Sequence, residues 1–254
     1  MPSTPPLIQT SAGPVPLPCS FRKLNYMAAL FESPCDIINE LLKNTQCIPA
    51  LKMGHKHYIA IGFIEYTDSD LGAYNEMILS VPCIPEGEKQ SPLLWLNLLS
   101  SLKNRKVLQY VPQIYVTSAL SRAAGREIWG FPKEILQITA KPNADDYAFE
   151  LKDESSDLIC SIKGKMEYGI ALKTPDMLTL TFKNDIPWIT PVHVEHECKV
   201  YIRPRLQLRL GNSNHTLCNT LEKLNLANAR PLLAFHAPTF KAVFEAGAKQ
   251  MKKG

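Results

Sequence analysis

The chain has 254 residues, 45% of them apolar, and its 28 Lys and Arg against 24 Asp and Glu leave a formal net charge of +4. A chain of this length can bury a full core, so we expect a single domain over residues 19–254, preceded by an arm over residues 1–18. The small, dispersed positive charge excludes nucleic acid as the expected partner, because nucleic-acid-binding proteins concentrate Lys and Arg on one surface.

The cysteines and the longest apolar stretch bear on the compartment. Seven cysteines are scattered without the spacing of a disulfide framework or a zinc site. No cationic, apolar and small-residue leader opens the sequence. The longest apolar stretch, residues 92–102, has about half of the ~20 residues that a membrane helix needs. We therefore expect a cytoplasmic protein with free thiols and no membrane association.

The first elements in chain order are an arm and a helix. Residues 1–18 hold six prolines, which favours an extended arm or a strap across a neighbour. A helix is predicted to follow, ending near Asn44, with Ser33 as its cap, Pro34 in its first turn and Asp36 closing a capping box. Its apolar stripe comprises Ile37, Ile38, Leu41 and Leu42.

Strands dominate the rest of the chain. Continuous apolar runs predict deeply buried strands over residues 58–66, 76–83 and 108–117. Alternating apolar and polar residues predict half-buried antiparallel strands over residues 147–151, 158–168, 177–183 and 205–210. Two helices are expected near the end, over residues 216–227 and 239–251. The sequence therefore predicts a strand-dominated α+β domain, with an antiparallel β-barrel and a few peripheral helices as the architecture.

Metal and cofactor motifs are weak in this sequence. Four histidines could form a metal shell, but solvation explains the acidic residues beside them; these residues are His55, His57, His193, His196, Glu195 and Glu197. No glycine-rich phosphate loop precedes a βαβ pattern, and no serine nucleophile elbow is present. We predict neither a metal nor a cofactor.

The stretch GREIWGFPKEI, residues 125–135, places a lysine, Lys133, among apolar side chains. If residues 127–137 are extended, alternate side chains share a face. Lys133 then lies on one face with Trp129, Phe131 and Ile135, and the other face carries Gly130, Pro132, Glu134 and Leu136. Burial disfavours the ammonium and so favours the free amine, which is the nucleophilic form.

This hypothesis depends on one condition and has one alternative. A carboxylate about 4 Å from the ammonium would favour the charged form by about 4 kcal/mol, so Glu134 must point away from Lys133. Alternatively, Lys133 lies on an edge strand, with its stem on Phe131 and its ammonium in water.

Several segments resemble those of the acetoacetate decarboxylase family. In GREIWGFPKEI, Gly-Arg-Glu is followed by an aromatic residue, a proline and a lysine, as in the family signature. The other similar segments are NYMAALF at 25–31, LGAYNE at 71–76, GKMEY at 164–168 and LNLANARPLL at 224–233. The resemblance runs from about residue 20 to near the end of the chain and therefore covers the whole domain.

The resemblance implies a cone-like β-barrel, a homo-oligomer, and no metal or organic cofactor. It also implies a small keto acid as substrate, decarboxylated through a lysine Schiff base to a ketone and CO₂. Acetoacetate decarboxylase is itself an established example of a lysine activated by desolvation or by a cationic neighbour. In this chain Lys133 is identified as the nucleophile and Glu76 as the proton shuttle. The proposed substrate-binding residues are Arg126, Glu65, Phe131 and Trp129, although Arg126 could instead pair locally and fix the segment.

The chain departs from the family pattern near the lysine and near the start of the domain. The family's second lysine is replaced by Glu134, so apolar burial must activate the nucleophile. An expected arginine aligns with Leu24, where the neighbouring Arg22 or Lys23 could restore a cation.

An expected second acid aligns with Ile61, and Glu65, on the same strand face, could replace it. These departures leave two alternatives to decarboxylation open. One is an imine-forming aldolase or dehydratase acting on 2-keto acids. The other is a non-catalytic barrel that binds a small apolar or acidic ligand.

Overall fold

The computed structural model describes most of the chain. The described residues are 5–53, 55–90, 102–104, 106–141, 146–174, 176–195, 197–245 and 249–250. The predicted apolar stretch 92–102 therefore lies, except for Leu102, outside the described residues. No helix in these ranges is both long and apolar enough to span a bilayer.

Strands greatly outnumber helices, as the sequence predicts. The strands are β1 (Leu7–Thr10), β2 (Gly13–Pro16), β3 (Cys19–Pro34), β4 (Cys47–Pro49), β5 (Lys52–Met53), β6 (Lys56–Ser69), β7 (Tyr74–Pro85), β8 (Leu108–Val116), β9 (Lys133–Ile135), β10 (Gln137–Ala140), β11 (Asp146–Lys152), β12 (Leu158–Lys165), β13 (Ile170–Lys173), β14 (Met177–Lys183), β15 (Ile186–Glu195), β16 (Glu197–Ile202), β17 (Arg205–Leu210), β18 (Leu233–Phe244) and β19 (Lys249–Gln250). The helices are α1 (Cys35–Leu42), α3 (Ala119–Trp129), α4 (Thr216–Lys223) and the short 3₁₀ helix η1 (Leu102–Asn104). All seven predicted strands are confirmed.

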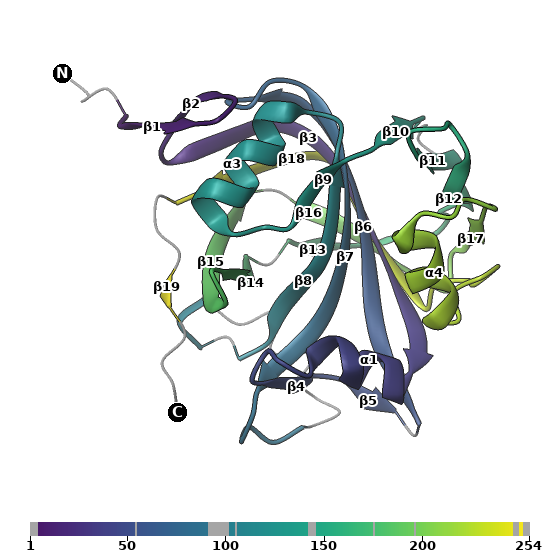
Figure 1. Cartoon of the computed structure of the whole chain (residues 1–254). Coiled ribbons are helices and arrows are strands. Elements are labelled where there is room, and N and C mark those ends of the chain that lie inside the picture. Colours follow the sequence, from purple (N-terminus) through teal and green to yellow (C-terminus); the bar gives the residue numbers. More distant parts are fainter. Residues whose placement is uncertain are drawn as a thin grey trace.

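One large curved sheet organises the molecule (Figure 1). Its strands follow the order β13-β16-β18-β3-β6-β7-β8-β14-β15-β19, with β4, β5 and β9 added at the side and with β15 also pairing with β18. Most pairs are antiparallel, but β8 pairs in parallel with β14 and with β9. The description of this sheet as a closed, cone-like barrel stays a prediction.

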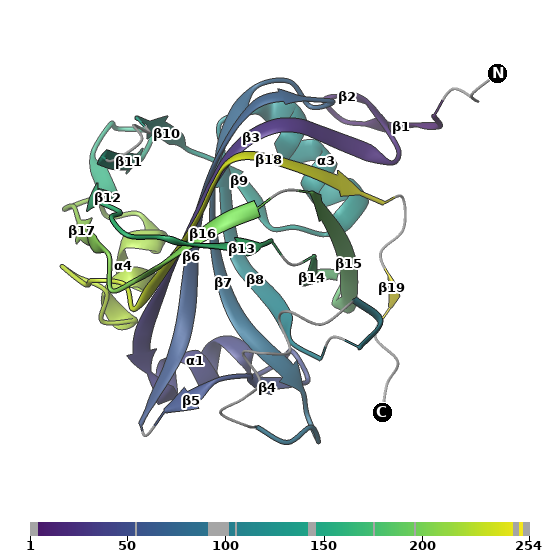
Figure 2. The same ribbon diagram turned by 180° about the vertical axis from the view of Figure 1, so that it is seen from behind.

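The long strands bury both faces, which explains their continuous apolar runs. Ile61 belongs to a core shared with α1, α4 and the four-stranded sheet β10-β11-β12-β17. Ile64 belongs to a second core shared with α3 and the N-terminal hairpin of β1 and β2. Figures 1 and 2 show α3 on one side of β6 and β7, α4 and the four-stranded sheet on the other side, and α1 across the lower ends of the two strands. Each strand therefore has two distinct environments, one on each face.

Helices α1 and α4 were predicted correctly, but the cap of α1 differs. Pro34 occupies the cap position and makes no side-chain capping bond. The Ser33 hydroxyl instead donates a hydrogen bond to the Leu224 carbonyl, 3.1 Å away. The buried serine therefore joins α1 to the segment after α4, and a tertiary contact has replaced the predicted local one.

The helix predicted over residues 239–251 is wrong. Residues up to Phe244 belong to β18, which pairs with β3 and with β15. Figure 2 shows β18 running beside β3. The Ala, Lys and Glu content of this segment favours a helix by only a few tenths of a kcal/mol per residue, so pairing on both sides overrides it.

Helix α3 was not predicted, and residues 127–129, expected to be extended, form its last turn. Ser118 caps the helix by accepting a hydrogen bond from the Ser121 backbone N–H. Gly130 ends it in the left-handed conformation, with φ of 71°. The extended conformation begins after this glycine. Because β8, α3 and β9 form a crossover, β9 runs parallel to β8.

The proline-rich arm is a hairpin that packs against α3. Strands β1 and β2 pair antiparallel, and the turn between them contains Ser11. The Ser11 backbone N–H and hydroxyl both donate hydrogen bonds to the Glu127 carboxylate on α3. The predicted extended character is confirmed, and the neighbour that the arm contacts is a helix of its own chain.

Candidate active site

Lys133 is the first residue of β9, and the preceding turn directs its side chain back across α3. The Phe131 N–H donates to the Gly125 carbonyl at 2.9 Å, which folds the chain back against the helix. A Cβ atom at position 125 would lie 2.5 Å from Lys133 Cδ, closer than any ordinary carbon contact. Gly125 therefore provides the space that the lysine stem occupies.

The Lys133 ammonium group lies in a buried polar cluster formed by three separate elements. Its Nζ is 2.7 Å from Glu76 Oε2 on β7 and donates to Ser121 Oγ on α3 at 2.9 Å. The Lys133 and Glu76 side chains are 8% and 3% exposed. The alternative with the amine in water is therefore wrong, and Lys133 belongs to a buried ion pair.

The carboxylate of Glu76 changes the expected basis of lysine activation. Burial alone disfavours the ammonium, but an adjacent carboxylate stabilises it. Transfer of one proton from Lys133 to Glu76 converts the ion pair into a free amine and a neutral acid. Apolar burial is therefore not the only influence on the amine, because Glu76 provides a proton acceptor within hydrogen-bond reach of the nucleophile.

Two tyrosines complete the surroundings of this pair. The Tyr66 hydroxyl donates to Glu76 Oε1 at 3.1 Å, and the Tyr66 and Tyr74 rings stack with centroids 4.2 Å apart. Lys133 Nζ lies 5.6 Å from the Tyr74 ring centroid and 6.0 Å from that of Phe131. Burial, reinforced by the Glu76 charge, raises the pKa of both phenols well above its usual value, so both remain hydrogen-bond donors.

The residue after the lysine points away from it, as alternation along a strand requires. The Glu134 side chain is 55% exposed, and its Oε1 lies 3.7 Å from Arg126 Nη2. Alternation is confirmed from Phe131 to Glu134, since Phe131 and Lys133 are buried while Pro132 and Glu134 are exposed. The neighbouring carboxylate therefore does not pair with the lysine.

The Arg126 side chain contacts the backbone of the segment that carries Lys133. Its Nε donates to the Lys133 carbonyl at 2.6 Å. This bond anchors β9 to α3, and Glu127 anchors the hairpin from the next position of the helix. Arg126 therefore has the local structural role that the sequence offered as the alternative to substrate binding.

Trp129 and Phe131 occupy different places. The Trp129 indole N–H donates to the Glu245 carbonyl at 3.2 Å, and its ring meets Phe244 edge-on. Trp129 therefore belongs to the core beneath α3, and no described contact joins it to Lys133. Phe131, by contrast, lies beside the amine.

The start of β3 supplies an apolar residue and no cation to this cluster. Leu24 pairs across the sheet with Tyr66, so both side chains share the face that carries Glu76, and Leu24 is buried. Arg22 turns outward to Asp68 and Asp70, and Lys23 is exposed. Neither cation replaces the expected arginine.

Glu65 lies on the opposite face of the sheet. Glu76 pairs with Ile64, whereas Glu65 pairs with Asn75, so the two glutamates project in opposite directions. Ile61 lies on the same face as Glu65, within the other core. Glu65 therefore does not join the Lys133 cluster, and the substrate-binding role predicted for it is not supported by its position.

The candidate metal histidines are dispersed. His57 Nδ1 lies 3.1 Å from the Leu51 carbonyl oxygen, and burial lowers the pKa of His57. His193 lies 3.3 Å from Glu245, His55 is exposed, and His196 lies outside the described residues. In the part of the chain that the structure describes, no three His, Cys, Asp or Glu side chains group as metal ligands.

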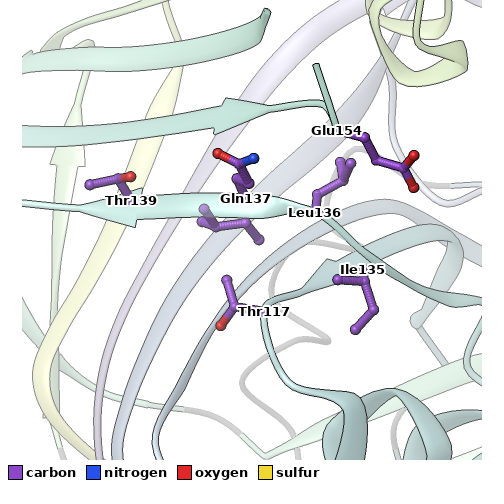
Figure 3. Close-up of a pocket in the computed structure, with 7 residues that line it drawn as sticks. Thr117, Ile135, Leu136, Gln137, Thr139 and Glu154 are labelled. Carbon is purple, nitrogen blue, oxygen red and sulfur yellow. The ribbon is translucent and has the colours of Figure 1, made fainter. Parts of the chain in front are cut away.

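Two surface cavities flank the segment between β9 and β10. One, of about 550 Å³, is lined by Thr117, Ile135, Leu136, Gln137, Ile138, Thr139 and Glu154. Figure 3 labels Ile135, the last residue of β9, Leu136, which follows it, and Thr117 nearby. The second, of about 490 Å³, includes Arg122, Arg126 and Glu134 in its lining. Lys133 lines neither cavity, although the residues that follow it line both.

Similar proteins share this fold. Acetoacetate decarboxylase from Legionella pneumophila subsp. pneumophila str. Philadelphia 1 is 17% identical, with a TM-score of 0.64 over 99% of this chain and 92% of that one. The enduracididine biosynthesis enzyme MppR, solved with pyruvate, is 11% identical, with a TM-score of 0.62 over 95% of this chain and 93% of its own. An acetoacetate decarboxylase-like enzyme from Sphingomonas wittichii RW1 is 12% identical, with a TM-score of 0.56 over 91% and 93% of the two chains.

Sequence comparison identifies the family more directly than these distant structures do. A search of curated proteins found no match. The family model described as acetoacetate decarboxylase (ADC), however, matches residues 1–197, which include the hairpin, Glu76, α3 and Lys133. This chain therefore belongs to the acetoacetate decarboxylase family.

Proposed function

We propose that this protein is an imine-forming carboxy-lyase that decarboxylates acetoacetate or a related 3-keto acid, with Lys133 as its nucleophile. The observation that carries the proposal is the buried Lys133–Glu76 pair, 2.7 Å apart, in which a nucleophile and a proton acceptor already touch. Such a pair is the arrangement that amine catalysis needs.

The reaction follows from moving one proton within this pair. Glu76 accepts a proton from Lys133, and the free amine attacks the keto carbon of the substrate. Glu76 then returns a proton to the carbinolamine oxygen, which leaves as water to give the iminium. The electrons of the C–C bond to the carboxylate flow into the iminium as CO₂ departs, and the resulting enamine is protonated on carbon by a proton taken up from solvent. Water then hydrolyses the product iminium and regenerates Lys133.

The surrounding residues support these steps. Ser121 holds the amine, Tyr66 orients the Glu76 carboxylate, and Phe131 provides an apolar wall. Arg126 lines the cavity beside β9, so its exposed guanidinium nitrogens can bind a carboxylate on the approach to the site. A homo-oligomeric state and a cytoplasmic location stay predictions.

Trapping with borohydride tests the nucleophile. Reduction in the presence of acetoacetate should attach the substrate carbons to Lys133, as peptide mass analysis would show. Lys133→Arg should abolish the adduct and CO₂ release, because a guanidinium cannot form the imine. Lys183→Arg, a change to a lysine whose amine contacts the Glu127 carbonyl, is the matched control and should retain both. Absence of an adduct in the unaltered protein would support a ligand-binding role without catalysis.

A second candidate is an aldolase or dehydratase acting on 2-keto acids through the same imine. Two observations favour it: the similar protein MppR was solved with pyruvate, and Glu134 rather than a second lysine follows Lys133. The two candidates are separated by trapping with pyruvate and by measuring CO₂ release from a panel of 2-keto and 3-keto acids. Adducts with both classes but CO₂ from neither would favour the aldolase or dehydratase.

A further inference from the structure

The hydroxyl of Tyr74 is buried beside the amine and is unsatisfied. Tyr74 is 5% exposed, and within the described residues its hydroxyl completes no hydrogen bond. It lies beside the side-chain hydroxyls of Ser121 and Tyr66. Ser121 Oγ accepts a hydrogen bond from Lys133 Nζ, and the Tyr66 hydroxyl donates to Glu76 Oε1. A buried hydroxyl without a partner destabilises a folded protein, so it calls for an explanation.

Packing explains the ring of Tyr74 but not its oxygen. The ring stacks on Tyr66 with an interplanar angle of 16° and covers Lys133 Nζ at 5.6 Å. A phenylalanine would make both contacts without an unpaired polar atom. The hydroxyl therefore has a use that the protein alone does not satisfy, and its place beside the nucleophile indicates a ligand.

The side chains around the Tyr74 hydroxyl indicate which kind of ligand atom it binds. Ser121 Oγ lies 2.9 Å from Lys133 Nζ and also adjoins the Tyr74 hydroxyl. The Ser121 hydroxyl therefore neighbours both the amine and the Tyr74 hydroxyl. Glu76 contacts the amine directly, and in the proposed reaction it returns a proton to the oxygen of the reacting carbonyl. The Tyr74 phenol keeps its proton because burial raises its pKa well above the usual value. It can therefore donate a hydrogen bond to an acceptor.

We propose that the Tyr74 hydroxyl donates a hydrogen bond to a second oxygen of the substrate, located two carbons from the carbon that reacts with Lys133. The inference rests on the proposed function, since it requires an imine at Lys133. The ligand class is a 1,3-dioxygenated carbonyl compound. A 3-keto carboxylate and a neutral 1,3-diketone share this chemistry.

Three probes test the assignment in the full-length protein. Borohydride trapping at Lys133 is measured against concentration for acetone, which lacks a second oxygen, and for acetoacetate and acetylacetone, which have one. Tyr74→Phe should raise the half-saturating concentration of the two dioxygenated probes about 10-fold, the effect of one lost hydrogen bond, and leave acetone unchanged. If Tyr74→Phe raises the half-saturating concentration of acetoacetate alone, the acceptor is the carboxylate. If it raises the values for acetoacetate and acetylacetone alike, the acceptor is an oxygen that need not be charged.

A matched control and a stability measurement separate this role from a structural one. Tyr58 is also buried with an unpaired hydroxyl, but it pairs across the sheet with Glu32, at the other end of β6 from Tyr66. Tyr58→Phe should leave trapping of all three probes unchanged. Without substrate, Tyr74→Phe should raise the Tm or leave it unaltered, because it removes an unsatisfied group; a structural hydroxyl would give a lower Tm.

The outcomes distinguish the two proposals. Equal weakening of all three probes by Tyr74→Phe, no weakening of any, or a lowered Tm would overturn the role of Tyr74 while leaving the imine in place. Absence of any adduct at Lys133 in the unaltered protein would overturn the proposed function, and the role of Tyr74 with it.

Discussion

Replacing Gly125 by alanine tests whether the position of the lysine depends on one missing methyl group. The new Cβ would lie 2.5 Å from Cδ, 2.8 Å from Cε and 2.9 Å from Cγ of Lys133. Because all three atoms belong to a flexible side chain, the lysine stem is expected to move, by about 1 Å to regain normal contact distances, and the helix is expected to stay. A shift of about 1 Å at a reacting group costs about 10²-fold in rate.

The assay is the rate of borohydride-trapped adduct formation at Lys133, compared with the free energy of unfolding in urea. We expect Gly125→Ala to slow trapping about 100-fold. Alanine stabilises a helix interior by about 1 kcal/mol relative to glycine, whereas overpacking costs about 1–3 kcal/mol, so the change in stability should be small by comparison.

A double-mutant cycle shows whether the clash is with the lysine itself. In a Lys133→Ala background the obstructing atoms are absent, so Gly125→Ala should there stabilise the protein by about 1 kcal/mol. Additive stability changes, together with an unchanged trapping rate, would refute the reasoning, because they would mean that the lysine stem does not occupy the space above Gly125.

Three further predictions concern the ion pair, a buried histidine and the hairpin. Lys133→Met and Glu76→Gln should each destabilise the protein by about 3–5 kcal/mol in urea unfolding, and the double variant by less than their sum, since each single change leaves one buried group unpaired; strict additivity would argue against the pair. Burial lowers the pKa of His236 from 6.5 to about 4. The unfolded state therefore binds more protons between those values, and stability should fall by about 3 kcal/mol as the pH drops from 6.5 to below 4. His236→Gln should flatten this dependence, and a variant as acid-sensitive as the parent would contradict it. Glu127→Ala removes the acceptor for Ser11 and should increase hydrogen exchange in the hairpin, leaving β6 protected; unchanged exchange in the hairpin would show that other contacts hold it.

Much of the site could be expected from local sequence. The signature containing Lys133 marks the family, and strand alternation correctly sends Glu134 away from the lysine. The pairing of Lys133 with Glu76 spans 57 residues of sequence, so periodicity could not show it. The signal for Glu76 came from its resemblance to the family segment. Ser121 lies outside the segments that resemble the family, and Tyr74 lies within LGAYNE but was given no role, because an ordinary serine or tyrosine becomes informative only through its neighbours in space.

The largest errors have a common cause. Helix α3 contains Gly125 and ends at Gly130, and these glycines lower the local helix propensity that would have revealed it. The segment of β18 beyond residue 239 has a helical composition but lies between β3 and β15. In both places packing against distant elements outweighs local preference.

The sequence by itself determined the strand-rich class, the two buried faces of the long strands and the family to which the lysine motif belongs, because these depend on apolar periodicity and on adjacent residues. The tertiary structure alone decided that Glu65 faces the other core, that Arg126 supports the backbone of β9, and that Glu76, Ser121 and Tyr74 surround one amine. Those outcomes depend on the register between strands and on the crossover through α3, which bring together side chains that no local spacing relates.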